Sequence, residues 1–461
     1  MRTWILLGSL AALSACGSSG SGNDVTCGDG TTLVGDSCEP GGSGAGDTCG
    51  SGTHLDGTTC VADGSGSAAG APTIATIDPP DAGVSGNVLF TITGTGFAGS
   101  NVSSLHVYFG DTTPGGDCEA QVGAATSTTI AGEVPSACDL NVIVTVTTNN
   151  GSATIPFHYD ALIAADGDGG GQAGAYGDLY VIDPYAQVFF DLGVMNDGTN
   201  GYGMSGIAFA SDGTLYGVTT GDSPADLDGF SQLVTIDLGT ATVTPIGDAV
   251  AGNGDGYWVT DIKVSGTTIY GWAYDVTNNF RQSIVTIDTT TGAVTAHGPA
   301  AQSYYVDGGI AFDGTGTLYV AANGASADPD DPAELAATGE LDTANTTSGA
   351  LTMSATLDYG IGAPVNALAY FTTDLLAVVD NGTYGMIEGE PLYGETLALI
   401  DTSQTPIVSP LFELPAQIGA QSAVDALAVP PAAFTIARTL PRARWQTLKA
   451  TANAPSLRHA R

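Results

Sequence analysis

Positive charge is almost absent from this sequence. Its 461 residues include only 9 Lys and Arg, against 48 Asp and Glu. One basic residue lies before residue 16 and six lie after residue 437, so the long stretch between holds only Lys263 and Arg281. Such a surface repels phosphate, which disfavours direct binding to nucleic acid and to anionic lipid headgroups. The acidity fits either adaptation to high salt, which weakens self-repulsion, or bridging through divalent metals.

Catalytic motifs are also missing. The sequence has no Gly-x-Ser-x-Gly turn of a serine hydrolase and no His-Glu-x-x-His of a zinc protease. It has 5 histidines, of which only His297 lies between residues 177 and 437. The sequence therefore names no catalytic residue, and an enzyme is the less favoured reading. A lactonase-like hydrolase that works through calcium and oxygen ligands alone is the alternative.

Long apolar runs are absent except for a short one at the start. Residues 4–13 are apolar, which is too short to remain as a membrane-spanning helix, and Arg2 precedes them. They are followed by Leu13-Ser14-Ala15-Cys16, which resembles the bacterial lipobox. The resemblance implies a lipoprotein signal peptide over residues 1–15, cleavage before Cys16 and acylation of that cysteine, so that the lipid bilayer is a partner. Gly17 follows in place of an aspartate, so we expect an exported lipoprotein of the outer membrane or cell surface. An ordinary signal peptide is the alternative.

Six further cysteines form an even set, which in an exported chain indicates disulfides. Residues 16–71 are a Gly/Ser tether that contains two copies of the pattern C-G-x-G-T-x-L-x-G-x-x-C. Neither copy is large enough to bury a core, so we expect the staples Cys27–Cys38 and Cys49–Cys60, worth about 2–3 kcal/mol each. A zinc site is the alternative, but the Cys-x-x-Cys spacing typical of zinc sites is absent.

The composition changes at residue 72 into short strands that alternate apolar and polar residues, such as LHVYFG and NVIVTVTTNNG. About ninety residues of this kind suit a small β-sandwich. The stretch resembles an IPT/TIG domain, which implies an Ig-like fold over residues 72–160 that acts as a spacer or binding module. On this reading Cys118 and Cys138 form a disulfide within the domain. The matching residues are Pro72, Ile77, Pro79, Ile92–Phe97, Val134-Pro135 and Asn150-Gly151 to Phe157–Tyr159.

Two elements alternate from residue 177 onward, each occurring five times at intervals of roughly 50 to 60 residues. One is a strand–turn–strand hairpin, marked by Asp-Gly or Gly-Thr turns, and the other is an apolar strand that ends in Asp. We expect each such Asp to accept hydrogen bonds from the turn that follows it. The hairpins begin at Gly206, Asp261, Gly309, Ala367 and Ala426, and the apolar strands end at Asp183, Asp237, Asp288, Asp342 and Asp401.

Each pair of elements supplies about four strands, which is one blade of a β-propeller. We therefore predict an all-β protein in which residues 177–437 form a five-bladed propeller; six blades are the alternative. The first strands lack a preceding hairpin and the last strand, ALAV, lacks a following partner, so together they complete one blade and close the ring. An open solenoid would leave these two half-units unexplained. Residues 161–176 are predicted to be a linker, and residues 438–461 a basic disordered tail.

Oxygen-bearing residues at the starts of the inner strands, near the axis, are the first candidates for a metal site, with calcium as the candidate cofactor. These are Ser205, Thr260, Asp261, Gly308, Asn366 and Asp425. The acidic loop that contains Asp222, Asp226 and Asp228 is a second candidate. In both places the residues also suit a plainer role, as strand caps or solvated loops. Aromatics such as Tyr257, Trp258 and Trp272 are candidates for stacking on a sugar or for packing between blades.

Taken together, these features predict a surface-anchored lipoprotein that acts as a calcium-assisted binding or adhesion module at the cell envelope. A glycan or an envelope protein is the expected partner. A secreted propeller hydrolase and a purely structural envelope spacer are the alternatives.

Overall fold

The protein is described by a computed structural model that divides the chain into two compact units, residues 1–68 and 69–461. Among the residues described, no helix is long and apolar enough to cross a membrane. The described residues are 31–34, 37–40, 53–56, 59–62, 70–97, 104–167, 177–220, 229–278, 281–298, 308–322, 339–357, 365–387, 390–404, 407–414, 424–431 and 446–447.

The first unit contains two matching hairpins. β1 (Thr31–Val34) pairs with β2 (Ser37–Pro40), and β3 (Thr53–Asp56) pairs with β4 (Thr59–Ala62). The registers are equivalent, because Leu33 lies opposite Cys38 as Leu55 lies opposite Cys60. The sequence repeat is thus a structural repeat. Cys16, Cys27 and Cys49 lie outside the described residues, so the lipidation and the two staples stay predictions.

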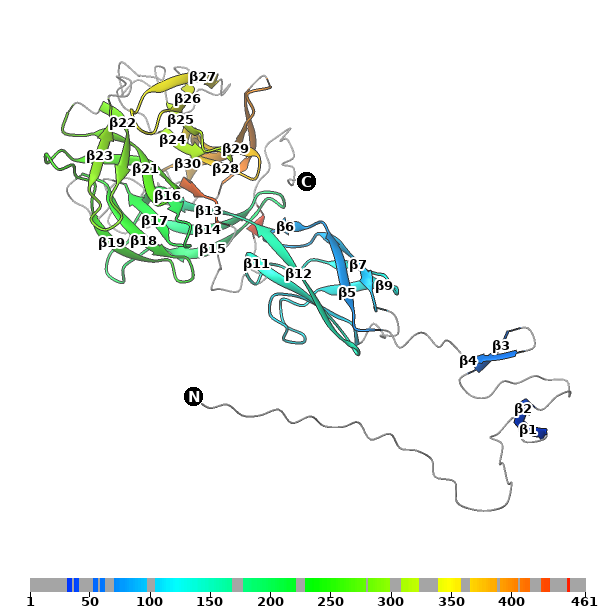
Figure 1. Ribbon diagram of the computed structural model, residues 1–461. Helices are drawn as coiled ribbons and strands as arrows, with labels where there is room; N and C mark the ends of the chain where they lie inside the picture. The colour runs from blue at the N-terminus through cyan, green and yellow to red at the C-terminus, as the bar shows by residue number, and fades with distance from the viewer. Residues whose placement is uncertain are drawn as a thin grey trace, which may run out of the picture. The chain divides into compact units, whose positions relative to one another are not determined.

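Residues 73–160 form a sandwich of two four-stranded sheets, which confirms the predicted Ig-like fold (Figure 1). Alternation places one face of each strand inside: β11 buries Val142, Val144 and Val146. Phe90 and Phe109 contact each other in the core between the sheets. The first sheet is β5 (Thr73–Asp78), β7 (Leu89–Thr95), β10 (Thr129–Glu133) and β9 (Gln121–Ala125); the second is β6 (Asp81–Gly83), β12 (Gly151–Asp160), β11 (Asn141–Thr148) and β8 (His106–Phe109).

The expected disulfide of this domain is present between Cys118 and Cys138, whose Cα atoms lie 5.9 Å apart. It connects the segment before β9 with the segment before β11, and the carbonyl of Cys118 also accepts a hydrogen bond from the amide of Phe109 in β8.

Beyond residue 203, four sheets of four antiparallel strands follow one another, each built in chain order from an inner strand outward. Tight turns join the strands of each hairpin, as at Gly213 and Gly266, both of which have positive φ. The sheets are β16 (Met204–Phe209), β17 (Leu215–Thr219), β18 (Gln232–Asp237) and β19 (Thr242–Asp248); β20 (Tyr257–Ser265), β21 (Thr268–Asp275), β22 (Arg281–Ile287) and β23 (Val294–His297); β24 (Gly308–Phe312), β25 (Leu318–Ala322), β26 (Gly339–Ala344) and β27 (Leu351–Leu357); and β28 (Val365–Phe371), β29 (Asp374–Ile387), β30 (Glu390–Ile400) and β31 (Val408–Glu413).

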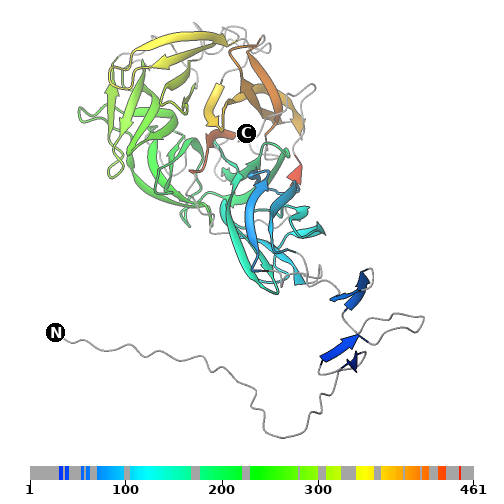
Figure 2. The same cartoon turned by 45° about the vertical axis from the view of Figure 1, so that its right-hand side comes forward.

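A further sheet combines the two ends of the repeat region. Its inner strand is β32 (Val424–Ala428), from the end of the chain, and the next strands are β13 (Leu162–Asp166), β14 (Asp178–Asp183) and β15 (Val188–Val194). The inner strands contact one another in the cyclic order β32, β16, β20, β24, β28 and back to β32. Figure 2 shows the sheets of this region arranged in a ring. The predicted closure between leading and trailing strands is therefore present. Five such sheets lie in the described part of the chain, which fits the predicted blade number.

The predicted linker at residues 161–176 is wrong for its first part. Residues 162–166 form β13, which is fully buried and pairs with both β14 and β32. Only Ala161 separates it from β12, so the sandwich runs directly into the closing sheet. The five-residue strand was missed because the Gly-rich stretch after it dominates the local composition.

The basic tail also differs from its prediction at one point. Residues 446–447 form β33, which pairs antiparallel with the outer strand of the closing sheet: Gln446 lies opposite Phe189 and Thr447 lies opposite Val188. The rest of residues 438–461 lies outside the described residues.

The Asp that ends each third strand does accept hydrogen bonds from the following turn. Asp237 binds the amide of Thr240, Asp288 those of Thr290 and Thr291, and Asp401 that of Ser403. In the sheet of β24–β27 the expected Asp342 lies inside β26 instead. Asn345 takes the turn position and accepts from the amides of Thr347 and Ser348, because an Asn side chain makes the same turn.

Asp183 has a second role, because it also joins the sandwich to the propeller. Its Oδ1 accepts from the amides of Tyr185 and Ala186. Its Oδ2 accepts from the backbone amide and the hydroxyl of Ser85, at 3.0 and 2.6 Å. Gly83 packs so closely on this carboxylate that a Cβ would overlap it. The side chain is 1% exposed, so these hydrogen bonds form in a buried interface.

We expect Asp183→Asn to weaken this joint, because its amide nitrogen would face the donors of Ser85 while its oxygen still serves the turn. The free energy of unfolding should fall by about 1–3 kcal/mol. Asp237→Asn is the matched control: it caps the equivalent turn, its side chain is exposed, and its effect should stay within about 0.5 kcal/mol. Denaturant unfolding of both variants measures the difference, and equal effects would contradict the role of Asp183.

Candidate functional site at the propeller axis

The inner strands carry equivalent residues in successive layers around the axis. Alignment of their sequences places Gly206, Asp261, Gly309, Ala367 and Ala426 at one level. The residue before each of these forms the first layer, and these five residues form the second. The residues two and three positions after them line the last part of the axis. The candidate site is therefore described layer by layer, from strand start to strand end.

In the first layer, the strand starts bulge out of their ladders. The register skips Ser205 in β16, Thr260 in β20 and Asn366 in β28, and the pairing of β13 with β32 skips Asp425. A bulge turns the skipped side chain out of the sheet. The Ser205 hydroxyl donates to the carbonyl of Val259 at 2.6 Å, and the Thr260 hydroxyl donates to that of Gly308 at 2.9 Å. These two predicted site residues thus join neighbouring sheets.

Asn366 lies between two carboxylates in the same layer. Its Nδ2 donates to Asp425 Oδ1 at 3.2 Å and to Glu395 Oε1 at 3.3 Å. Asn366 and Glu395 are buried, with 8% and 4% exposure. Asn366 and Asp425 were expected near the axis, whereas Glu395 was not. Its position in the middle of β30, just before the apolar run LALI, was the available signal.

The second layer is filled by the carboxylate of Asp261, which is completely buried. Its Oδ2 accepts from the backbone amides of Ile310 in β24 and Leu368 in β28, at 2.9 and 3.2 Å. Its Oδ1 accepts from the amide of Ile262 and from Lys263 Nζ, at 2.8 and 2.5 Å. One side chain therefore connects three inner strands.

Glycines make room for this contact. A Cβ on Gly206 would lie 2.7 Å from the Cα of Asp261, and a Cβ on Gly309 would lie 2.4 Å from the amide nitrogen of Leu368. Both values are shorter than any real contact, so the inner strands approach too closely for side chains at these positions.

Lys263 lies in the third layer, where four sheets have alanine: Ala208, Ala311, Ala369 and Ala428. The small residues leave space for one long side chain. Lys263 Nζ contacts Asp261 and the carbonyl of Ile262, and its side chain is 13% exposed. Burial raises the pKa of Asp261 to about 6, against the opposing effect of Lys263. Burial likewise lowers the pKa of Lys263.

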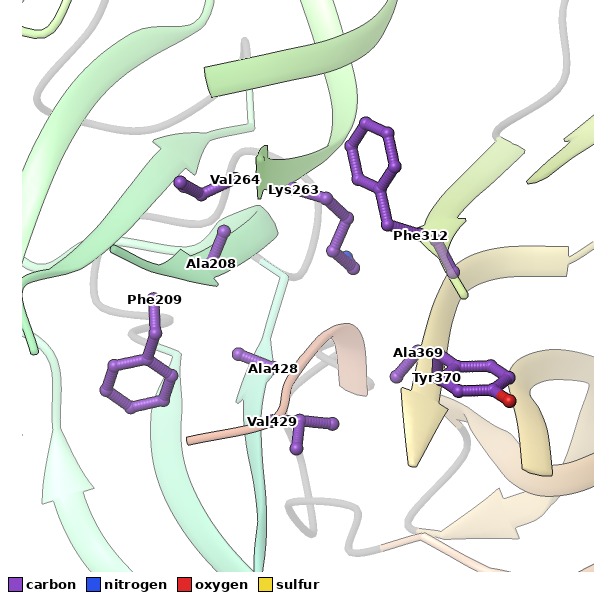
Figure 3. A pocket seen from close by; sticks show the side chains of 10 residues that line it. Ala208, Phe209, Lys263, Val264, Phe312, Ala369, Tyr370, Ala428 and Val429 are labelled. Atoms are coloured by element: carbon purple, nitrogen blue, oxygen red, sulfur yellow. The ribbon is translucent and has the colours of Figure 1, made fainter. Parts of the chain in front are cut away.

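The ends of the inner strands surround a pocket of about 130 Å³, in which Lys263 reaches into the enclosed space (Figure 3). All five inner strands contribute the same two positions. The inner position holds the four buried alanines and Lys263, and the outer position is half-buried and apolar. The outer residues are Phe209, Val264, Phe312, Tyr370 and Val429.

Of the candidate axial ligands, Asn366 and Asp425 contact each other in the first layer, whereas Asp261 lies in the second layer. Asp222, Asp226 and Asp228 lie outside the described residues, so that loop stays a prediction. Within the described ranges, no group of three or more His, Cys, Asp and Glu side chains could hold a metal ion. Asp261 has protein donors at both oxygens and a lysine as its counter-ion, so in the structure it connects strands; a role as a cation ligand stays a prediction.

The aromatic residues at the pocket differ from the candidates that the sequence suggested. Trp272 is fully buried and Tyr257 is 5% exposed, which places both in packing between and within the sheets. The aromatic side chains that border the pocket are Phe209, Phe312 and Tyr370, which no motif in the sequence marks. Their signal was positional: each follows the small residue of the repeated inner strand.

We expect Asp261→Asn to lower the free energy of unfolding by about 3–5 kcal/mol, because it leaves Lys263 buried without its partner and turns a donor toward backbone amides. Asp248→Asn, at an exposed acid of β19, is the matched control and should change little. Adding Lys263→Met to Asp261→Asn should recover part of the loss. A wild-type unfolding midpoint for Asp261→Asn would contradict this connecting role.

A comparison with known protein families identifies the sandwich. Residues 72–159 match the family model of the IPT/TIG domain. No curated protein matches the chain. Among solved structures, it is similar to a protein of unknown function from Bacteroides thetaiotaomicron, with 14% identity and a TM-score of 0.29, over 79% of this chain and 90% of that one.

Two other solved structures are similar over shorter stretches. A protein of unknown function from Bacteroides caccae has 10% identity and a TM-score of 0.31, over 59% of this chain and 99% of that one. A provisional 6-phosphogluconolactonase from Bacteroides uniformis has 10% identity and a TM-score of 0.32, over 56% of this chain and 84% of that one. At these TM-scores the likenesses carry no argument about ligand or activity. Residues 72–159 are therefore an IPT/TIG domain, joined to a propeller-like domain of four-stranded sheets.

Proposed function

We propose that this protein is a binding module of the cell envelope, attached through acylated Cys16, that holds a glycan at the axial pocket of its propeller. The observation that carries the proposal is the pocket itself, to which all five inner strands contribute the same two positions. The IPT/TIG domain supports a role in binding or adhesion.

The chemistry of the pocket favours a sugar over a strongly charged ligand. Half-buried rings of Phe209, Phe312 and Tyr370 border it, and aromatic faces stack on the apolar faces of sugars. Lys263 is the charged side chain among the lining residues, and Asp261 already pairs with it. The pocket therefore offers apolar contact and little net charge.

The proposal predicts that Tyr370→Ala lowers glycan affinity about fivefold, because stacking contributes on the order of 1 kcal/mol at such sites. Met353→Ala is the matched control, since Met353 is 55% exposed on β27 and does not line the pocket. The measurement is a glycan array, followed by titration of the hits. It uses the full chain with Cys16→Ser, with and without calcium, at low and high salt.

Two outcomes would contradict the proposal. Equal affinity of Tyr370→Ala and wild type would remove the pocket from binding, and the absence of any glycan hit at all salt concentrations would remove the glycan. Turnover of lactones by the same preparation would instead favour the hydrolase.

A further inference from the structure

The amine in the axial pocket has surroundings that an ordinary surface lysine lacks. Lys263 Nζ contacts Asp261 Oδ1 at 2.5 Å and donates to the carbonyl of Ile262 at 2.9 Å. Its side chain is 13% exposed and reaches into the space at the ends of the inner strands (Figure 3). The sequence has one other lysine, Lys449, which gives an internal reference for the reactivity of this amine.

The residues around Nζ leave room for a small molecule. The other four inner strands hold alanine at the equivalent position, and the pocket has a volume of about 130 Å³. Within the described part of the chain, Nζ has two acceptors, Asp261 Oδ1 and the carbonyl of Ile262. An ammonium group has three hydrogens, so one is available to a ligand in the pocket.

The carboxylate beside the amine is held in place independently of it. Asp261 accepts hydrogen bonds from three backbone amides, at 2.8 Å from Ile262, 2.9 Å from Ile310 and 3.2 Å from Leu368. These donors keep the carboxylate in position when Lys263 changes its bonding. Asp261 lies within hydrogen-bond distance of Nζ, so it can exchange a proton with the amine and act as counter-ion to a cation formed there.

Burial brings both groups closer to proton transfer near neutral pH. It lowers the pKa of Lys263, against the opposing effect of Asp261, so more of the amine is neutral than in an exposed lysine. It also raises the pKa of Asp261 to about 6. A desolvated lysine in an apolar pocket is the kind of lysine that attacks carbonyl carbons and forms Schiff bases.

We propose that Lys263 captures a small neutral aldehyde, such as the open-chain form of a short sugar, as a reversible Schiff base. Lys263 gives one proton to Asp261, and the neutral amine then attacks the carbonyl carbon. A second proton passes from the nitrogen to the former carbonyl oxygen. The proton held by Asp261 converts the resulting hydroxyl to water, which leaves. The product is an iminium ion that keeps one hydrogen on nitrogen and pairs with the ionised Asp261.

The pocket suits a neutral carbonyl compound. Its charge does not change on capture, because an iminium replaces an ammonium beside the same carboxylate. The apolar rings of Phe209, Phe312 and Tyr370 border the space, and exclusion of water slows hydrolysis of the iminium. The inference uses the pocket proposed for a glycan, but it does not require glycan binding, because the aldehyde is bonded to Nζ itself.

The first test is reductive trapping with glycolaldehyde and NaBH₃CN at pH 7, on the full chain with Cys16→Ser. Reduction converts a Schiff base into a stable secondary amine, and peptide mass spectrometry then locates it. We expect Lys263 to be modified at least about tenfold faster than Lys449, because an ordinary lysine with a pKa near 10.4 is almost wholly protonated at pH 7. Equal rates at the two lysines, or an unmodified Lys263, would overturn the proposal.

The second test asks whether the reaction takes place inside the pocket. Ala369→Leu fills the space beside Lys263, so trapping there should slow at least about tenfold while trapping at Lys449 is unchanged. Ala296→Leu, the same substitution at an exposed residue of β23, is the matched control and should leave both rates as in wild type. Ala428→Leu repeats the test on another inner strand if Ala369→Leu does not fold.

An unchanged rate at Lys263 in a folded pocket-filling variant would show that the amine reacts from solvent, and would overturn the proposal. The glycan array contains neither glycolaldehyde nor reductant, so it tests the proposed function separately. Trapping without glycan binding would leave the Schiff base and remove the glycan, and glycan binding without trapping would do the reverse.

Discussion

The buried carboxylate of Asp261 is the contact on which the ring of inner strands depends. Inner strands are sheet edges that face the axis, so their inward amides have no ladder partner. Asp261 accepts from two of these amides, in β24 and β28, and Lys263 balances its charge. Gly206 and Gly309 permit the close approach that the contact requires. The pocket one layer further along exists only because these strands are held in place.

The ring shows how a repeat acquires a distinct site. Four sheets carry glycine or alanine where the second sheet has Asp261, and four carry alanine where it has Lys263. An acidic residue at this position in every sheet would place several negative charges on one axis. One acid and one base, two residues apart on the same strand, satisfy the axis and leave the remaining volume for a ligand.

The sequence predicted the sheets and the closure because both depend on local signals. Alternating strands, Asp-Gly turns and the complementary half-units at the two ends are visible without coordinates. Contacts between sheets are not visible in the sequence. The amides that donate to Asp261 belong to Ile310 and Leu368, far along the chain, so the sequence suggested that its oxygens were available to a metal. Glu395 was missed for the same reason, since its partner Asn366 belongs to another strand of the sheet. β13 was missed because five apolar residues next to a Gly-rich stretch carry no turn signal of their own.

The closing sheet joins several parts of the molecule. It contains the first and last strands of the ring, it accepts β33 at its outer edge, and through Asp183 it binds Ser85 of the IPT/TIG domain. Only Ala161 separates the sandwich from β13. If the chain is anchored at Cys16 and a ligand is held at the axis, tension between them enters the propeller at this sheet. The hydrogen bonds that resist it are those of Asp183 to Ser85 and those that pair β13 with β14 and β32.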